Sequence, residues 1–301
     1  MTETVPRTLP RTLPRTSART VPDATAAATA FAFAASAPAA RTARAPRRPL
    51  ASRGWIALGG GAVLPVLILA AWQLTTALGV FTMAQLPSPA MVWQAGVDLF
   101  ASGLLGQYAA ISTQRVLIGF AVGAALGIAL GALVGLSRAA DVLFAPTLGA
   151  IRAVPSLAWV PLLILWLKIG EESKLTLIAI GAFFPVYTTV SAALRHVDRQ
   201  LVEAGRAFGL RRARLFTAVQ LPAVIPAVVS GLRLALAQAW LFLVAAELIA
   251  SSMGLGFLLI DSQNNGRIDR ILLAIILLAI LGKLTDAAVG LFERWANRKW
   301  A

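Results

Sequence analysis

Residues 203–222 read EAGRAFGLRRARLFTAVQLP and form a charged interruption between two long apolar runs. Leu201, Ala204 and Phe208 recur at spacings of three and four residues, so we expect one apolar stripe along a short helix. Gly209 follows that stripe, and glycine commonly ends a helix because it accepts a left-handed backbone. The stretch is therefore predicted to be a short surface helix between two membrane-crossing segments. The three arginines that follow also fit a basic loop that contacts lipid headgroups.

Six apolar runs around this loop are long enough to cross a bilayer, which takes about 20 residues in a helix. They are Trp55–Val80, Val116–Leu136, Val142–Leu167, Leu175–Leu194, Leu221–Ala250 and Ile271–Phe292. Backbone polar groups in lipid must be satisfied within the chain, and these runs lack the alternation of barrel strands, so we expect helices. With 58% hydrophobic and 13% charged residues, the sequence excludes an ordinary soluble domain. The prediction is an all-α membrane domain of six helices over residues 54–301.

The positive charge of the chain, +14 at pH 7, follows the predicted topology. If the N-terminus is cytoplasmic, 19 of the 27 Lys and Arg residues fall on the cytoplasmic side and five on the other. Because Lys and Arg gather on the cytoplasmic side of membrane proteins, both ends of the chain are predicted to be cytoplasmic. The charge therefore does not indicate a nucleic-acid partner, and membrane lipid is the expected surroundings.

Residues 1–53 have a different composition, rich in Ala, Thr, Pro and Arg, with no apolar periodicity that could bury a core. This composition is typical of a disordered segment, and we interpret it as a basic cytoplasmic tail that can contact anionic lipid. A cleaved targeting peptide is the alternative, since such peptides are also rich in Arg and poor in acidic residues.

A glycine ladder runs through the second apolar run. Gly119, Gly123, Gly127, Gly131 and Gly135 repeat every four residues, which places a shallow groove on one helix face. A second helix can approach such a groove closely. We expect that helix to belong to the same chain, with a dimer interface as the alternative.

Prolines interrupt the third and fourth runs. Pro146, Pro155 and Pro161 lie in the third run and Pro185 in the fourth. Proline removes a helical hydrogen bond and kinks or breaks a helix, which lipid tolerates only where protein or a cavity replaces that bond. Both helices are therefore expected to face protein or a pathway.

Residues 81–108 connect the first two runs and are predicted to form an external hairpin on the membrane surface. Trp93, Phe100 and Tyr108 would suit the membrane interface, where amphipathic aromatic rings gather.

Several positions in and after the loop together resemble the signature of bacterial ABC-importer permeases. Glu203 is followed by a small pair, by a glycine six residues later, and by an apolar residue with Leu221-Pro222. The chain departs from the usual pattern with Gly205 in place of Ala, which makes a helix less stable by about 1 kcal/mol, and with Val219 in place of Ile. The resemblance implies the fold of a type I ABC importer transmembrane domain, whose coupling helix docks onto a separate ATPase. The residues it assigns to ATPase coupling are Glu203, Ala204, Gly205, Phe208, Gly209, Leu221 and Pro222.

The resemblance extends over residues 85–295. Residues 152–162 (RAVPSLAWVPL), 231–234 (GLRL) and 245–250 (AAELIA) resemble the branch that imports sulfonates, taurine, nitrate and related anions. Residues 281–286 (LGKLTD) are similar to aliphatic-sulfonate permeases in particular. The resemblance implies a permease subunit that imports small organic anions across a bacterial inner membrane by alternating access. The implied partners are two copies of an ATPase subunit, a second copy of the permease in a homodimer, and an external substrate-binding protein.

Charged residues inside the apolar runs need a partner or a function, because a charge in lipid is costly. Arg152 and Arg233 are predicted at similar depth, about 10 to 17 Å from the cytoplasmic ends of their helices. Guanidinium groups suit the oxygens of sulfonate or nitrate, so lining an anion pathway and forming a structural ion pair both stay open. The residues assigned to a pathway are Arg152, Pro155, Trp159, Arg233 and Gln238.

Two further charged positions have simpler interpretations. Glu247, near the outer end of the fifth run, would repel an anion, so we expect it to form an ion pair or a hinge. Lys283 and Asp286 are three residues apart on one helix face and are expected to neutralise each other.

Catalytic patterns are missing from the sequence. A phosphate-binding loop requires Gly, four residues and then Gly-Lys-Ser/Thr, and the one Gly-Lys pair is followed by Leu284. With no cysteine and the single His196, neither a metal site nor a cofactor is expected. The chain is thus predicted not to be an enzyme. An ion-coupled secondary transporter, which would need carboxylates near the membrane midplane, and an intramembrane enzyme are the rival interpretations.

Overall fold

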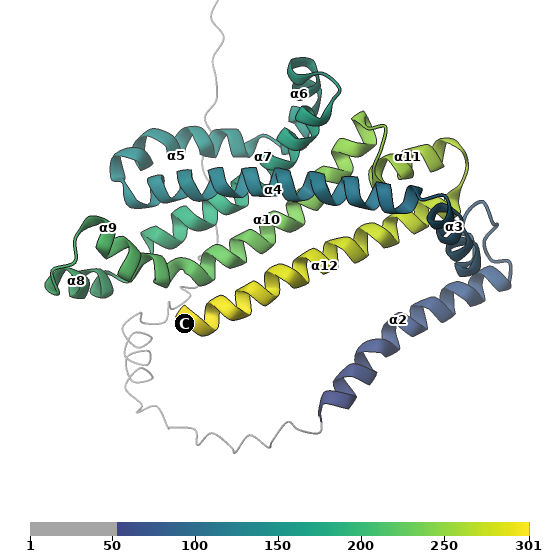
Figure 1. Ribbon diagram of the computed structural model, residues 1–301, viewed down its shortest axis with the longest axis horizontal. Coiled ribbons are helices and arrows are strands. Elements are labelled where there is room, and N and C mark those ends of the chain that lie inside the picture. The colour runs from purple at the N-terminus through teal and green to yellow at the C-terminus, as the bar shows by residue number, and fades with distance from the viewer. Residues whose placement is uncertain (1–52, 301) are drawn as a thin grey trace, which may run out of the picture. The chain divides into compact units, whose positions relative to one another are not determined.

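The computed structural model describes residues 53–300, so the tail predicted for residues 1–53 lies outside the described residues apart from Arg53. A compact unit begins at Gly61. The described residues are helical apart from short connections, which confirms the all-α prediction (Figure 1). The elements are α2 (Arg53–Ala77), α3 (Pro89–Ala101), α4 (Leu104–Leu136), α5 (Arg138–Ala153), η2 (Ser156–Trp159), α6 (Val160–Leu167), α7 (Glu171–Arg195), α8 (Arg199–Ala207), α9 (Arg212–Leu215), η3 (Phe216–Gln220), α10 (Leu221–Ala250), α11 (Leu255–Asn264) and α12 (Ile268–Trp300).

Four helices of the described chain are long and apolar enough to cross a membrane. They are α4, α7, most of α12, and the helix Ala213–Ile249 that contains α10. The halves of a fifth, broken span, α5 and η2–α6, meet at 87°, and α2 adds the apolar stretch Val63–Ala77. Five of the six predicted runs therefore correspond to elements that can cross a membrane, with the third run broken in the middle. The first run corresponds to α2, whose apolar stretch Val63–Ala77 is shorter than a membrane span among the described residues.

Helix α7 lies at the centre of the bundle. Figure 1 shows α4, α7, α10 and α12 side by side, with α5 along α4. Ile178, Ala182 and Val186 on α7 are completely buried, because α4 covers one side of this helix and α10 another. An apolar face of a membrane helix can meet lipid as well as protein, so the packing of α4 and α10, rather than the apolar composition of α7, defines its central place.

The glycine ladder of α4 packs against α7 of the same chain, as expected. A Cβ atom added at Gly119 would lie 2.6 Å from Cγ2 of Ile178, and one at Gly127 would lie 2.9 Å from the carbonyl oxygen of Phe183. Such distances are shorter than real Cβ contacts, so only glycine lets the two backbones approach this closely. The ladder therefore sets the separation between the two helices.

Proline breaks the third span at one point. Val154 has extended backbone angles, φ −72° and ψ 124°, because Pro155 disfavours the helical conformation of the residue before it. The chain then restarts as η2 and α6, with Pro161 in the first turn of α6, where no hydrogen bond is lost. Pro146 and Pro185 instead lie inside α5 and α7, which continue through them.

Residues 81–108, predicted as an external hairpin, contain the short helix α3 and the first residues of α4. A short helix, α3, begins at Ser88, whose side chain accepts a hydrogen bond from the backbone of Met91. Trp93 and Phe100 are each 75% exposed, as interfacial residues would be, but Tyr108 belongs to α4 and is buried. The second span thus starts 12 residues earlier than Val116, at Leu104. The apolar run in the sequence stops at the charge of Arg115, which the fold nevertheless buries.

Candidate functional site

The loop between α7 and α10 contains the predicted short helix, α8. Its first turn is capped by Asp198, whose side chain accepts a hydrogen bond of 2.8 Å from the backbone of Gln200. At its end Gly209 has a φ of +81°, and its N–H donates to the carbonyl of Arg206. The next N–H, of Leu210, donates to the carbonyl of Gly205, which completes a Schellman motif. Gly209 therefore ends α8, as the spacing predicts.

One side of helix α8, which we call the closed side, packs against the rest of the chain, and the opposite side, the open side, is exposed. On the closed side, Gly205 is buried, and an alanine Cβ there would lie 2.8 Å from Leu215 and 3.1 Å from Val219. The departure from alanine at this position thus makes room for the segment that follows the helix. On the open side, Phe208 is 87% exposed and Leu201 50% exposed.

The open side also carries a charge. Glu203 is exposed and forms an ion pair of 2.8 Å with Arg199, one turn earlier on the same helix. A surface ion pair of this kind contributes little to stability. Ala204 is exposed beside it, so the predicted apolar stripe and the acidic residue both face away from the rest of the chain.

The loop continues into the fifth span without a break. After α9, the residues Phe216–Gln220 form a π-helical turn, and Leu221 and Pro222 open α10. Together they form the continuous helix Ala213–Ile249. A displacement of α8 can therefore be transmitted along a stiff element into the membrane, since α8 packs on η3.

Arg233, predicted to line a pathway or to form a structural pair, is paired. Its Nε and Nη2 donate to the two carboxylate oxygens of Asp286, each at 2.9 Å, and its Nη1 donates to Glu293 at 2.8 Å. Gly290 lies opposite the guanidinium, where an added Cβ would be 3.7 Å away. Two carboxylates thus neutralise this arginine and join α10 to α12.

The pairing of Asp286 with Lys283 is secondary. Lys283 is 79% exposed and lies 3.5 Å from Asp286, whereas the bidentate contact of Asp286 is with Arg233. We call Arg233, Lys283, Asp286 and Glu293 the Arg233 cluster. The predicted pair of Lys283 and Asp286 is therefore present, but the main partner of Asp286 is Arg233, which the sequence did not predict.

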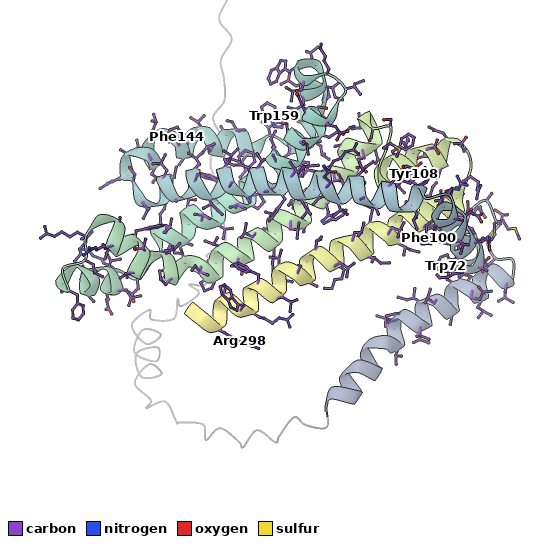
Figure 2. All side chains as sticks on the ribbon, viewed as in Figure 1. Trp72, Phe100, Tyr108, Phe144, Trp159 and Arg298 are labelled. Atoms are coloured by element: carbon purple, nitrogen blue, oxygen red, sulfur yellow. The ribbon has the colours of Figure 1, made fainter. Side chains whose placement is uncertain are left out.

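The other predicted pathway residues lie on three segments. Arg152 is exposed in the last turn of α5, and Pro155 is exposed at the break between α5 and η2. Trp159, labelled in Figure 2, ends η2 at the same bend and packs partly against the core. Gln238 is half-buried on α10. The structure brings none of them into contact with the guanidinium of Arg233, which faces α12.

A second charged cluster, which the sequence did not reveal, centres on Arg115. The Nε and Nη2 atoms of Arg115 donate to the carboxylate of Glu171 at 2.7 and 2.5 Å, and Nη1 donates to Glu247 at 2.7 Å. Lys174 lies 3.0 Å from Glu171. The side chain of Arg115 is 6% exposed, and Glu247 is completely buried. We call Arg115, Glu171, Lys174 and Glu247 the Arg115 cluster.

Glu247 also holds the turn between α10 and α11. Its carboxylate accepts hydrogen bonds from the hydroxyl of Ser112 at 2.9 Å and from the backbone N–H of Gly256 at 2.8 Å. The same hydroxyl accepts from the N–H of Leu255, the first residue of α11. The carboxylate thus satisfies the N–H of Gly256, and the hydroxyl of Ser112 satisfies that of Leu255, at the start of α11. The expectation of an ion pair at Glu247 is confirmed. Its partner, Arg115, directly precedes the second apolar run, and this position is the feature of the sequence that could have identified it.

Comparisons with known proteins give a consistent answer. The family model described as binding-protein-dependent transport system inner membrane component matches residues 123–298. Two proteins named aliphatic sulfonates transport permease protein SsuC are similar: that of Bacillus subtilis is 39% identical, covering 81% of this chain and 89% of that protein, and that of Escherichia coli is 44% identical, covering 77% and 88%. The taurine transport system permease protein TauC of Escherichia coli is 32% identical, covering 82% and 90%.

One solved structure supports the fold. A chain of the MetNI methionine ABC transporter in an inward-facing conformation superposes with a TM-score of 0.58. The match covers 65% of this chain and 97% of that chain at 21% identity, so it bears on the fold alone. The arrangement of helices around α7 is thus that of a type I importer transmembrane domain.

Proposed function

The chain belongs to the family of binding-protein-dependent transport system inner membrane components, and we propose that it is the permease subunit of an ATP-driven importer of aliphatic sulfonates. The observation that carries the substrate class is the identity of 39% and 44% with two aliphatic-sulfonate permeases, against 32% with a taurine permease. Taurine, nitrate and other small anions are the alternative substrates within the same branch.

The proposed assembly is a homodimer of this permease with two ATPase subunits and an external substrate-binding protein. Both ends of the chain and the loop with α8 lie on the cytoplasmic side of the bacterial inner membrane in this proposal. The support is the basic loop around α8, because Lys and Arg are retained on the cytoplasmic side. The long apolar helices α4, α7, α10 and α12 cross the membrane.

The proposed coupling surface is the open side of α8, made by Leu201, Glu203, Ala204 and Phe208. Phe208 is 87% exposed on a short helix, and its burial by a partner would be favourable because it removes apolar surface from water. In the proposal, the ATPase receives this surface and moves it when ATP binds. The continuous helix Ala213–Ile249 then carries the movement into the bundle and switches the side to which the pathway opens.

Growth and uptake test the substrate. A strain that lacks its own sulfonate permease, but retains the ATPase and binding protein that match this chain, should grow on an aliphatic sulfonate as sole sulfur source when the chain is expressed. Sulfate is the control for general growth. Uptake of taurine or nitrate without uptake of any alkanesulfonate would assign that anion as the substrate instead. Uptake that does not require ATP hydrolysis would refute the proposal of an ATP-driven importer.

Substitutions on α8 test the coupling surface. Phe208→Ser and Glu203→Ala should leave a folded, inserted permease, because both side chains are exposed, but should abolish ATP-dependent uptake and weaken co-purification of the ATPase. Arg199→Ala is the matched control, since it breaks the same ion pair without touching Glu203 or the stripe. Wild-type uptake by Phe208→Ser would refute the role of this surface.

A further inference from the structure

Arg152 stands in a pocket without a counter-charge. The pocket, with a volume of about 530 Å³, opens between α5, α7 and α10 and is lined by Arg152, Thr188, Thr189, Ala192, Ala193, His196 and Ala227. Within the described part of the chain, Arg152 has no hydrogen-bond or ion-pair partner. Asp141, the acidic residue in the first turn of α5, is paired with Arg195. The pocket therefore carries an uncompensated positive charge.

The surroundings of this pocket indicate that it holds water rather than lipid tails. An unpaired guanidinium within an apolar span must face a water-filled cavity or a polar headgroup, because hydrocarbon cannot solvate it. The outward face of α4 shows the contrast: Leu117, Val122 and Leu126 are each about half exposed and purely apolar, as a lipid-facing surface is. The pocket wall instead has two hydroxyls and an imidazole.

Arg152 is the main group on this wall that is free to bind a ligand. The hydroxyls of Thr188 and Thr189 donate to carbonyls of their own helix, at 2.9 Å to Phe184 and 2.8 Å to Pro185. Nδ1 of His196 lies 2.8 Å from the carbonyl of Ala192, which leaves the other ring nitrogen facing away from that bond. A ligand in the pocket would therefore be recognised mainly by the guanidinium fork.

The two arginines proposed for a pathway differ in the charge that a ligand would meet. Arg233 sits between Asp286 and Glu293, so an anion approaching it meets two carboxylates. Arg152 has no carboxylate partner among residues 53–300, so an anion approaching it meets a net positive charge. A guanidinium matches the grouped oxygens of an oxyanion.

We propose that this pocket is an oxyanion site on the cytoplasmic half of the permease, anchored by Arg152. The inference rests on the proposed function and deepens it, since the sulfonate group of the transported molecule is such an oxyanion. A single unburied guanidinium binds weakly, which suits a site that an anion must leave as readily as it enters. The phosphate of an anionic lipid headgroup has the same chemistry, and the two sources are separated by experiment.

Transport by the complete complex in liposomes is the first test. Arg152→Gln should lower the rate of alkanesulfonate import about tenfold, the factor that the loss of one charged hydrogen bond gives, while Arg152→Lys keeps part of it. The matched control is Arg138→Gln, which removes the same charge from an exposed position at the other end of α5. ATPase assembly is measured for each variant.

The composition of the liposomes separates the two sources of oxyanion. If Arg152 binds the transported anion, the defect of Arg152→Gln is equal in liposomes of phosphatidylcholine alone and in liposomes that also contain phosphatidylglycerol. If it binds a lipid headgroup, the defect appears only with phosphatidylglycerol. Import by Arg152→Gln at the rate of the unsubstituted permease in both liposomes overturns the site. Failure of the unsubstituted complex to import any sulfonate refutes the proposed substrate instead.

A labelling experiment probes the charge of the pocket without a measurement of transport. The chain has no cysteine, so Ala192→Cys places a single thiol on the pocket wall. A negatively charged sulfonatoethyl thiosulfonate should modify this thiol faster than its trimethylammonium analogue, and Arg152→Gln should remove the preference. An alkanesulfonate should slow the labelling of Ala192→Cys but not that of a control cysteine at Ala139, which is exposed at the other end of α5. Equal rates for both reagents with Arg152 present would overturn the proposal.

Discussion

The Arg115 cluster and the Arg233 cluster contain the same kinds of group but differ in burial. Each has an arginine bound to two carboxylates, with a lysine beside one of them. In the Arg115 cluster, the arginine side chain is 6% exposed and Glu247 is 0% exposed, although Glu171 is 56% exposed. In the Arg233 cluster, the arginine is 38% exposed and both carboxylates reach the surface. The number of ion pairs is therefore a poor guide to what each cluster does.

Burial changes the consequence of losing a partner. A buried carboxylate without its arginine cannot be rehydrated, and breaking such a pair costs about 3–5 kcal/mol. A half-exposed carboxylate can turn to water, and its ion pair contributes much less. The Arg115 cluster also joins more of the molecule, since it connects α4, α7, α10 and the turn before α11. We infer that the Arg115 cluster holds several helices of the bundle together, a role that we call a joint. The Arg233 cluster connects only α10 to α12, a role that we call a tie.

The largest effect is predicted for Arg115→Met, which leaves Glu247 buried and unpaired. The free energy of unfolding should fall by about 3–5 kcal/mol, measured as a loss of thermal stability of the purified permease in detergent. The double variant Arg115→Met, Glu247→Gln should recover part of that loss, because a neutral amide replaces the stranded charge. A single variant as stable as the unsubstituted chain would show that the cluster is not a joint.

Glycines beside the two clusters should respond in opposite ways. A Cβ at Gly256 would lie 2.6 Å from Cβ of Glu247, so Gly256→Ala should destabilise by about 1–3 kcal/mol through overpacking. A Cβ at Gly290 would lie 3.7 Å from the guanidinium of Arg233, an ordinary contact, so Gly290→Ala should be neutral or stabilising within its helix. Thermal unfolding of the two variants measures the contrast. Similar losses in both would contradict the difference in packing.

Arg233→Gln should have a smaller effect than Arg115→Met. The sequence leaves open a pathway role for Arg233, in which its removal would strand no partner. The structure gives it Asp286 and Glu293, which are 32% and 21% exposed and can take up water when the arginine is lost. We therefore expect a moderate loss of thermal stability and retained sulfonate uptake. Abolished uptake by a stable Arg233→Gln permease would return this arginine to the pathway.

Local patterns in the sequence predict the features that depend on neighbours along the chain. The stripe of Leu201 and Phe208, the helix end at Gly209 and the break at Pro155 all follow from backbone preferences within a few residues. The glycine ladder of α4 likewise predicts close packing, because its four-residue spacing lies on one helix face. One sequence is enough to locate these features, since each depends on residues within a few helical turns.

Partners far apart in the sequence cannot be predicted in the same way. The sequence pairs Asp286 with Lys283 because the two are one turn apart, yet the bidentate partner of Asp286 is Arg233, 53 residues away. Arg115 and Glu247 are separated by 132 residues, and only the packing of α4 beside α10 brings them together. A single sequence gives the reason that Glu247 needs a cation, its place in a membrane span, but does not say which cation meets it.

The smallest effect is predicted for the lysine at the edge of the Arg233 cluster. Lys283 is 79% exposed and lies 3.5 Å from Asp286, so its ion pair is open to solvent and Lys283→Met should change the free energy of unfolding by less than about 0.5 kcal/mol. Lys174, the corresponding lysine of the Arg115 cluster, is 5% exposed and lies 3.0 Å from Glu171, so Lys174→Met should be the more damaging of the two. Both substitutions remove one positive charge and keep a long side chain, which leaves burial as the main difference between them. Thermal unfolding measured side by side decides the point: if Lys283→Met costs as much as Lys174→Met, burial does not separate the two clusters and the distinction between joint and tie is lost.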